Sequence, residues 1–399
     1  MQASKLFQHF DELSALLQQT QHYWRPVAFH QTQMDWMEQH PDLLQRLYGL
    51  SPQQIEQLAT DALALTQFMV TDLPIAHQLA ALSAVPILPQ HATAQVAPHF
   101  YAGMPGRKWQ QVEAFASRVK PCNLPLLEWC AGKSHLGFYL ERCSQLPVTA
   151  LEWDQNMVQQ ANARAYRDHT TLHSHTIDVL SDAANRFITS EQQIVSLHAC
   201  GELHEHLLTL AADNKVQQLY IAPCCYHKRQ QDIYTPLSQR GRKFNLHLNK
   251  SELHTAVMET ATAGATIKRQ RTQLQIMRLG FDCLQKNLHG SEEFLPLPSL
   301  TAKWARANFA DFCQHCAALK NITLPASVDW QHYLKLGEQR FWQVAALDLV
   351  RFLFRRPLEI WLALDRAMLL QERGYAVQLG TFCSAKITPR NLLLQAYLP

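Results

Sequence analysis

From residue 124 onward, apolar runs of strand length alternate with segments of helical periodicity. Apolar runs at residues 124–128, 148–153, 170–176, 193–198 and 217–223 predict strands, and the segments between them predict helices. Runs at 375–382 and 392–398 predict two further strands, joined by a turn that carries Thr388, Pro389, Arg390 and Asn391. This alternation indicates an α/β fold, with a mostly parallel, seven-stranded sheet covered by helices on both faces.

Two other regions carry helical patterns and no clear strands. Residues 1–98 predict a helical N-terminal region, in which Ser51 and Pro52 begin one helix as its N-cap and first helical residue. Residues 229–355 predict a partly helical insertion before the last two strands, with a basic run at 268–271. The helical patterns in the C-terminal half lie at 301–319, 331–335, 341–354 and 358–371.

The stretch LPLLEWCAGKSHLGF at 124–138 combines a predicted strand, a tight turn around Gly132 and the start of a helix. Units of this kind bind nucleotides beyond the carboxyl end of the strand, beside the helix N-terminus. Glycine at 132 allows the backbone to approach a ligand closely. Glu128 ends the strand with a carboxylate, which suits a positive group, such as that of the amino acid half of S-adenosylmethionine, better than a pyrophosphate.

Carboxylates also follow the next two predicted strands. Glu152 lies about twenty residues after Gly132, where nucleotide-binding folds place an acid that accepts hydrogen bonds from ribose hydroxyls. Asp178 follows the third strand, in a position to accept a hydrogen bond from an adenine amino group. Three acids after successive strands predict one ligand with a sugar and an exocyclic amine. An ordinary αβ turn with unrelated acids is the alternative.

Histidines and cysteines are concentrated after the fourth and fifth strands, in SLHACGEL at 196–203 and APCCYHK at 222–228. Three interpretations are open: a zinc site, a nucleophilic cysteine assisted by His227, and a pocket that orients and deprotonates a methyl acceptor. The spacings His-x-Cys and Cys-Cys-x-x-His depart from the usual Cys-x-x-Cys of zinc sites. We favour the third interpretation, with His198, Tyr226 and His227 as catalytic residues and no metal ligand.

Several stretches resemble, in the same order, the signatures of a divergent branch of S-adenosylmethionine-dependent methyltransferases. This branch includes proteins once labelled ribosomal RNA adenine dimethylase domain-containing, and it is related to the enzyme that 2′-O-methylates the tRNA acceptor stem. The similar stretches are GMPGRKWQQV at 103–112, Glu-x-x-x-Gly-Lys-x-His-Leu at 128–136, SLHACGEL, APCCYHK and the segment at 364–394. Cys130 and Ser134 stand where the branch has glycines.

The resemblance implies a Rossmann-like core that binds S-adenosyl-L-methionine. By position, the methionine half would be held by Glu128, Cys130, Ala131, Gly132, Lys133 and His135, the ribose by Glu152 and the adenine by Asp178, with His198 also beside the cofactor. Arg107, Lys108 and Lys228 would contact the substrate. We therefore predict a helical region at 1–98, an S-adenosylmethionine-binding core at 99–228, a candidate substrate-binding insertion at 229–355, and a closing helix and strand pair at 356–399.

Composition bears on the compartment and on the substrate. Hydrophobic residues make up 47% of the 399 residues and charged residues 17%, which predicts a large packed core. The formal net charge of +3 is compatible with a nucleic-acid partner without demanding one. No apolar run reaches the ~20 residues that span a bilayer, and the first residues lack a secretion signal, so we expect a cytoplasmic protein with reduced cysteines and no membrane partner.

The combined expectation is an S-adenosylmethionine-dependent methyltransferase that acts on RNA, either tRNA or rRNA. A protein side chain as methyl acceptor is the first alternative. A module that binds the cofactor or a partner without catalysis is the second, and the replacement of two glycines by Cys130 and Ser134 favours it slightly.

Overall fold

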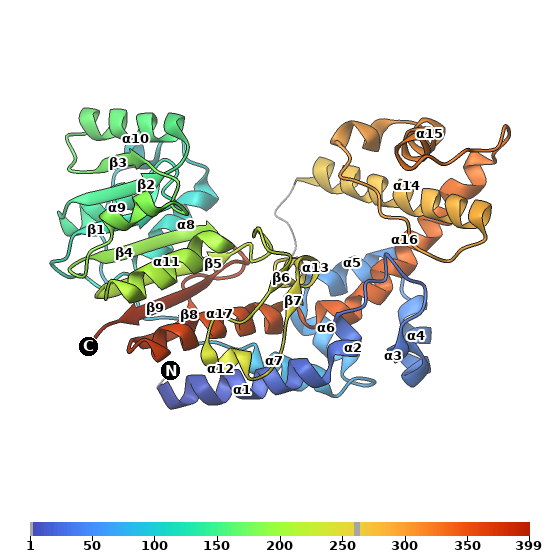
Figure 1. Ribbon diagram of the computed structural model, residues 1–399, viewed down its shortest axis with the longest axis horizontal. Coiled ribbons are helices and arrows are strands. Elements are labelled where there is room, and N and C mark those ends of the chain that lie inside the picture. The colour runs from blue at the N-terminus through green and yellow to red at the C-terminus, as the bar shows by residue number, and fades with distance from the viewer. Residues whose placement is uncertain (1–2, 259–263) are drawn as a thin grey trace. The chain divides into compact units, whose positions relative to one another are not determined.

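The computed structural model describes residues 3–258 and 264–399, and the chain forms two compact units (Figure 1). The first unit takes Met1–Gln19, Leu79–Glu259 and Arg355–Pro399, and the second takes Thr20–Gln78 and Thr260–Phe354. Each unit is therefore assembled from segments that are far apart in the sequence. Their limits do not coincide with the segment boundaries after residues 98 and 228 that the sequence predicts.

The first unit contains a seven-stranded sheet in the order β3-β2-β1-β4-β5-β9-β8 (Figure 1). Its strands are β1 (Leu126–Trp129), β2 (Val148–Glu152), β3 (His173–Thr176), β4 (Gln193–Cys200), β5 (Gln218–Cys224), β8 (Ala376–Thr381) and β9 (Leu392–Tyr397). The first five strands pair in parallel, and β9 pairs antiparallel with both β5 and β8. The predicted seven-stranded α/β fold is confirmed, including the closing strand pair.

Helices cover both faces of this sheet. α9 (His135–Ser144) and α10 (Gln155–Arg167) connect β1 to β2 and β2 to β3, whereas α11 (Glu202–Asp213) connects β4 to β5. Right-handed crossovers that run in opposite directions along the sheet place these helices on opposite faces. α8 (Gly106–Ala116) packs beside α9, and α17 (Arg355–Glu372) packs beside α11. The strand order reverses between β1 and β4, and ligands of open α/β sheets bind at such a switch point.

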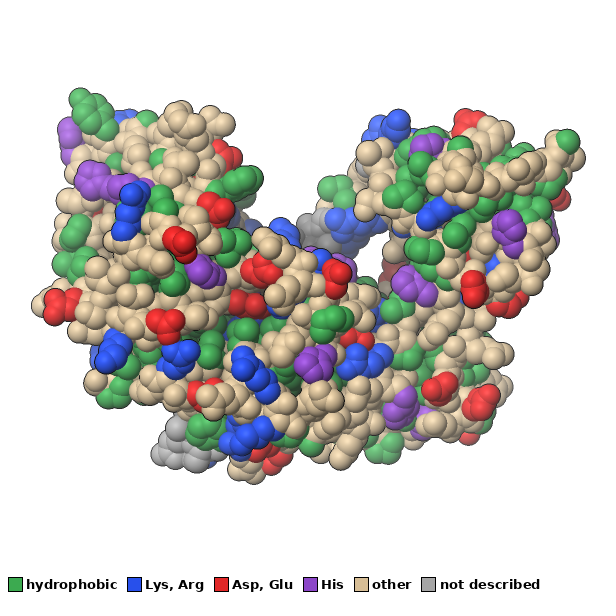
Figure 2. All heavy atoms as spheres, in the orientation of Figure 1, with side chains coloured by type: hydrophobic (Ala, Val, Ile, Leu, Met, Phe, Trp, Pro, Cys, Tyr) green, Lys and Arg blue, Asp and Glu red, His purple; other side chains and the backbone are tan. Residues whose placement is uncertain are grey.

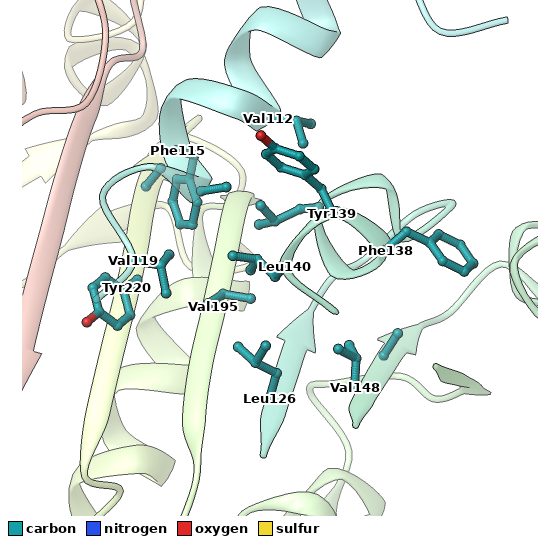
Figure 3. Packing of buried hydrophobic residues seen from close by; sticks show 14 of the residues in the cluster. Val112, Phe115, Val119, Leu126, Phe138, Tyr139, Leu140, Val148, Val195 and Tyr220 are labelled. Atoms are coloured by element: carbon teal, nitrogen blue, oxygen red, sulfur yellow. The ribbon is translucent and has the colours of Figure 1, made fainter. Parts of the chain in front are cut away.

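The core between the sheet and helices α8 and α9 is built from apolar side chains of all these elements (Figure 3). Phe115 of α8 and Leu140 of α9 point toward Val195 of β4 and Leu126 of β1, and none of the four is more than 4% exposed. Each such side chain stabilises the fold by roughly 1.5–3 kcal/mol. Strands buried on both faces carry continuous apolar runs, which is why the sequence pattern located them.

The remaining elements of the first unit are shorter, apart from α1. They are α1 (Ala3–Gln19), η1 (Pro98–Tyr101), η2 (Asp182–Phe187), α12 (Gln239–Arg242), α13 (Lys250–Thr255), and a two-stranded ladder of β6 (Ile233–Tyr234) and β7 (Leu248–Asn249). The sequence predicted no strand where this ladder lies. α1 packs on α17, where Trp361 Nε1 donates a 2.9 Å hydrogen bond to Ser14 Oγ.

Helices and the loops between them make up the described residues of the second unit. Its helices are α2 (Gln21–Trp24), α3 (Asp35–Gln39), α4 (Pro41–Tyr48), α5 (Pro52–Thr60), α6 (Ala62–Met69), α14 (Ala265–His289), η3 (Ala302–Arg306), α15 (Phe309–Lys320) and α16 (Trp330–Phe352), and the chain passes to the first unit within α7 (Ile75–Leu82). Among the helices of residues 3–258 and 264–399, none combines the length and the apolar character that crossing a bilayer demands.

In the second unit, one predicted helix is in fact divided, and two predicted helices are in fact one. The helix predicted at 301–319 is divided, because Asn308 caps α15 by accepting a hydrogen bond from the Asp311 N–H at 2.8 Å. The helices predicted at 331–335 and 341–354 form the single helix α16. Gly337 lies inside it because α14 packs closely there, and a Cβ atom at Gly337 would come within 2.5 Å of the Ile276 carbonyl oxygen.

A buried ionic group ties α17 to α11 and to β6 in the first unit. Arg366 is 1% exposed, and it donates hydrogen bonds of 2.6 Å to Glu205 Oε1 and to His204 Nε2. It also donates to the Tyr234 hydroxyl at 3.2 Å, and its guanidinium lies 4.8 Å from the ring centroid of Tyr226. A buried charge is tolerated only when its hydrogen-bonding capacity is satisfied in this way.

We expect Arg366→Met to lower the free energy of unfolding by about 3 kcal/mol or more, because the buried Glu205 carboxylate then keeps only its 3.6 Å pair with Arg229. The same change at Arg373 is the control, since its pair with Asp213 is about half exposed and contributes less than about 1 kcal/mol. Chemical denaturation followed by circular dichroism measures both variants, and equal losses would contradict the role of the buried pair.

Candidate functional site

The turn after β1 contains three residues with left-handed backbone conformation. Cys130, Gly132 and Ser134 have φ angles of 58°, 58° and 52°. Cys130 and Ser134 occupy the two positions where the methyltransferase branch that this sequence resembles has glycines, so the backbone keeps a glycine-like shape at a cost of about 1–3 kcal/mol for each side chain. The turn leads into the N-terminus of α9, where unpaired N–H groups favour a negative group of a ligand.

Glu152 fixes this turn from the end of β2. Its carboxylate accepts hydrogen bonds from the N–H groups of Gly132 at 2.8 Å, Trp153 at 3.0 Å and Asp154 at 3.1 Å, and the residue is 7% exposed. A carboxylate offers about four acceptor positions, which leaves one for a ligand hydroxyl. The predicted ribose contact fits this geometry, and Glu152 also holds the turn in place, which the sequence did not predict.

Glu128 is the penultimate residue of β1 and is only 4% exposed. Its Oε2 accepts a 3.1 Å hydrogen bond from the Gly137 N–H, and a Cβ atom at Gly137 would lie 2.5 Å from the same oxygen. Burial raises the pKa of Glu128 to about 8, although the Gly137 hydrogen bond and the nearby charge of Lys108 act in the opposite direction. Glu128 therefore retains its proton at neutral pH until a positive group approaches it.

The acids at the carboxyl ends of β1, β2 and β3 lie around one point near Cys130. Burial is the main cause that raises the pKa of the Cys130 thiol, and the neighbouring Glu152, Cys200, Asp178 and Glu128 raise it further. Asp178 is exposed, and its Oδ1 accepts a 3.0 Å hydrogen bond from the Leu180 N–H. The structure thus brings the predicted cofactor residues of three strand ends together beside the turn.

The other predicted cofactor residues of the turn are placed differently. The backbone N–H of Ala131 donates a 2.9 Å hydrogen bond to the Leu151 carbonyl, which attaches the turn to β2. Lys133 and His135 line a cavity of about 1110 Å³, together with residues of the 95–102 segment and of α10. Burial lowers the pKa of His135 to about 4, with help from Lys108, Arg164 and Lys133. Contact of Lys133 and His135 with the cofactor stays a prediction.

The two stretches rich in histidine and cysteine meet at Gly201. The Gly201 N–H donates a 3.0 Å hydrogen bond to the Cys224 carbonyl, and the Glu202 N–H donates one of 3.1 Å to the Lys228 carbonyl. Gly201 has a φ of 54°, and a Cβ atom there would lie 1.8 Å from the Lys228 carbonyl oxygen. Only glycine allows these two backbones to approach so closely.

His198 and His227 lie near this junction. Burial lowers the pKa of His198 to about 4, and its Nε2 is 3.2 Å from Gln111 Oε1. Burial also lowers the pKa of His227, whose ring meets that of His254 edge-on with centroids 4.8 Å apart. The Nδ1 atoms of both predicted catalytic histidines are buried and have no hydrogen-bond partner among the described residues. A ring nitrogen without a partner keeps the capacity for one further hydrogen bond.

Tyr226, the third predicted catalytic residue, is enclosed. It is 0% exposed, its ring meets His204 edge-on, and Arg366 lies over its face. Its hydroxyl is buried with no hydrogen-bond partner within residues 3–258 and 264–399. This enclosure favours a structural role that connects the 224–228 loop to the buried ionic group, and contact with a substrate stays a prediction.

The predicted substrate-binding cations are exposed. Arg107 and Lys108 lie at the start of α8, and Lys228 lies in the loop after β5. Lys108 is close enough to His198 to contribute, after burial and Arg390, to its lowered pKa. Arg390 was not predicted as a site residue. It lies in the predicted turn between the last two strands, and that turn belongs to the carboxyl edge of the sheet.

Comparison with known proteins supports part of the prediction. Residues 107–232 match the family model described as Methyltransferase domain. A geranyl diphosphate methyltransferase in complex with SAM is 12% identical, with 34% of this chain and 62% of that chain covered at a TM-score of 0.26. TrmK from M. capricolum, in complex with S-adenosyl-homocysteine, is 13% identical, with 30% and 51% covered at a TM-score of 0.23. The curated proteins give no significant match.

The chain therefore carries a methyltransferase domain, as the sequence predicted. The match covers residues 107–232, which include β1 through β5 and both stretches that meet at Gly201. This chain spans less than two thirds of each of the two solved structures. Because both TM-scores are low, we assign the fold from the sheet topology of this chain and not from these two structures.

We expect Gly201→Ala to destabilise the fold by about 3 kcal/mol or more, because a Cβ atom 1.8 Å from the Lys228 carbonyl oxygen forces the two backbones apart. Gly103→Ala is the matched control. Gly103 also has a positive φ, of 81°, yet no described atom lies within 4 Å of its Cβ position, so that change should cost only about 1–2 kcal/mol. Thermal unfolding measures both. A loss at Gly201 no larger than at Gly103 would contradict the close contact.

The raised pKa of Glu128 predicts a pH dependence of stability. Between its ordinary pKa of 4.5 and the folded value of about 8, the folded chain keeps a proton that the unfolded chain releases, so the wild type loses stability as the pH rises through this range. Glu128→Gln does not titrate, and we expect its stability relative to the wild type to increase with pH across that window. Thermal unfolding without cofactor tests this, with the exposed Glu191→Gln as control. A difference that does not change with pH would refute the assignment.

Proposed function

We propose that this protein transfers the methyl group of S-adenosylmethionine to RNA, either tRNA or rRNA. S-adenosylmethionine as the methyl donor is supported by the group of acids around Gly132, among which Glu152 accepts a 2.8 Å hydrogen bond from the Gly132 N–H. The family-model match over residues 107–232 supports methyl transfer as the reaction. The site lies at the switch point between β1 and β4, where this type of sheet binds nucleotides.

In this proposal the adenosyl group lies over the Gly132 turn. One of its ribose hydroxyls donates to the remaining acceptor position of Glu152, and its adenine amino group donates to Asp178. The methionine ammonium approaches Glu128, whose pKa of about 8 falls when a cation binds beside it. The methionine carboxylate is placed at the N-terminus of α9, where the helix dipole favours an anion.

RNA as the acceptor is supported by cations at the carboxyl edge of the sheet, between the Gly132 turn and the Gly201 junction, a region that we call the crevice. Arg390 and Lys108 lie within electrostatic range of His198, and Lys228 lies within range of Cys225. In the part of Figure 2 that shows the sheet-bearing unit, Lys and Arg side chains are interspersed with Asp and Glu over the visible face. Positive charge at the crevice would therefore contact a phosphate backbone locally rather than over a wide basic surface.

Methyl transfer depends mainly on the positioning of the acceptor atom relative to the methyl donor. The acceptor atom attacks the methyl carbon in line with the bond to the sulfonium sulfur, and S-adenosylhomocysteine leaves. An acceptor hydroxyl also has to lose a proton to a base. His198 and His227 are the proposed acceptors of this proton, because both rings lie near Cys225 and have an Nδ1 atom with no partner in the described ranges. The proposed compartment is the cytoplasm, which suits the free state of all ten cysteines.

The acceptor class is tested by a transfer assay. Purified protein is incubated with methyl-labelled S-adenosylmethionine and, separately, with total RNA and total protein from cells that lack its gene. We expect label in the RNA fraction that ribonuclease removes. Label confined to the protein fraction would replace RNA by a protein acceptor, and tight cofactor binding without any transfer would indicate a binding module.

The donor site is tested by Glu152→Ala. Loss of this carboxylate leaves one ribose hydroxyl and the Gly132 N–H without an acceptor, so we expect S-adenosylhomocysteine to bind about 1–3 kcal/mol more weakly by titration calorimetry. Circular dichroism confirms that the variant is folded. Glu191→Ala is the matched control. Glu191 is exposed and lies just before β4, at the amino ends of the parallel strands, whereas Glu152 lies at their carboxyl ends. Unchanged affinity in Glu152→Ala would mean that the ribose lies elsewhere.

A further inference from the structure

Three thiols converge at the carboxyl ends of β4 and β5. The Sγ atoms of Cys200, Cys224 and Cys225 all lie within 4.8 Å of one another, and those of Cys200 and Cys224 are 3.7 Å apart. Two sulfur atoms bound to one tetrahedral zinc ion at about 2.3 Å are roughly 3.8 Å from each other. Two of the three thiols therefore already have the spacing of ligands that share one metal ion.

The backbone takes uncommon conformations where it brings these sulfur atoms together. Cys225 has a φ of 47° and His198 a φ of 69°, and the pairing of β4 with β5 shifts register between Leu197 and Cys200. A left-handed residue other than glycine costs about 1–3 kcal/mol, and such strain is concentrated at functional sites. Cysteines that only fill space in a core have no need of this strain.

The surroundings of the three thiols suit a complex of three thiolates with one divalent cation, which carries a net negative charge. Lys228 and Arg390 lie within electrostatic range of the Cys225 sulfur, where they offset the negative charge that three thiolates carry. The His227 ring is also within electrostatic range of Cys225, and its Nδ1 is buried without a partner among the described residues. The thiols share the crevice of the proposed methyl donor, since Cys200 lies within electrostatic range of Cys130 in the turn after β1.

We propose that Cys200, Cys224 and Cys225 together bind one thiophilic divalent cation, for which Zn²⁺ is the best match. Zn²⁺ prefers tetrahedral sites with thiolate and imidazole ligands, and three thiolates leave a fourth position for an imidazole, a water molecule or an acceptor atom. Methyl transfer itself requires no metal, so this site goes beyond the proposed function and does not depend on it. The proposal replaces the expectation of no metal ligand that the sequence spacing favoured.

Cobalt substitution tests the site in the full-length protein. The chain is purified under reducing conditions, treated with a chelator and titrated with Co²⁺. We expect one equivalent to bind with the strong thiolate-to-cobalt absorption and the intense d–d bands of tetrahedral coordination, and Zn²⁺ to displace it. Cys225→Ser should weaken binding by at least about tenfold. Cys200→Ser is the second variant, should Cys225→Ser fail to fold.

Cys130→Ser is the matched control, because this cysteine lies in the same crevice, also has a positive φ, and is outside the three-thiol group. It should keep the full cobalt spectrum. Ellman's reagent shows whether the thiols are reduced before each titration. Failure of reduced wild-type protein to give thiolate-to-cobalt absorption would overturn the proposal, as would a spectrum that survives unchanged in both Cys225→Ser and Cys200→Ser. The titration contains no methyl donor, so its outcome is separate from that of the transfer assay.

Discussion

The close approach of two backbone segments at Gly201 is the constraint on which the arrangement of the crevice depends. Because Gly201 has no Cβ atom, the end of β4 lies directly against the carbonyl of Lys228. Two hydrogen bonds, from Gly201 to Cys224 and from Glu202 to Lys228, hold the segments in register. Three cysteine thiols and two histidines are thereby brought to one edge of the sheet, beside the turn at Gly132.

The buried charge of Arg366 supports this arrangement from the face of the sheet that α11 and α17 cover. Arg366 pairs with Glu205 on the helix that follows Gly201, and its guanidinium lies over Tyr226 in the loop that Gly201 contacts. Tyr234 connects the same arginine to the β6–β7 ladder. The segment at 364–394, which resembles the closing part of the methyltransferase branch, thus contains a residue that positions the site without reaching the proposed cofactor.

The sequence predicted the features that depend on short-range patterns and on the order of the strands. β1 was expected at residues 124–128 and lies at Leu126–Trp129, because a strand buried on both faces needs an apolar run. The gathering of Glu128, Glu152 and Asp178 followed from the rule that parallel strands end at one edge of their sheet. These predictions required no knowledge of side-chain packing.

The features that the sequence did not predict depend on contacts between distant segments. The length of α14 was missed because its first turns are basic, and its packing depends on Gly280 and Gly337, which lie 57 positions apart. The three-thiol group was missed because Cys200 and the Cys224–Cys225 pair are brought together by strand pairing rather than by a ligand motif. The placement of Arg390 depends likewise on the closing strand pair.

The central claim is that an adenosyl methyl donor binds over the Gly132 turn, between the ends of β1 and β2. A crystal structure of the full-length protein with S-adenosylhomocysteine tests this most directly. We predict that one ribose hydroxyl lies within hydrogen-bonding distance of Glu152 and that the adenine lies beside Asp178. A ligand bound elsewhere, or a turn at Gly132 that stays closed over Glu152 while ligand is in excess, would contradict it.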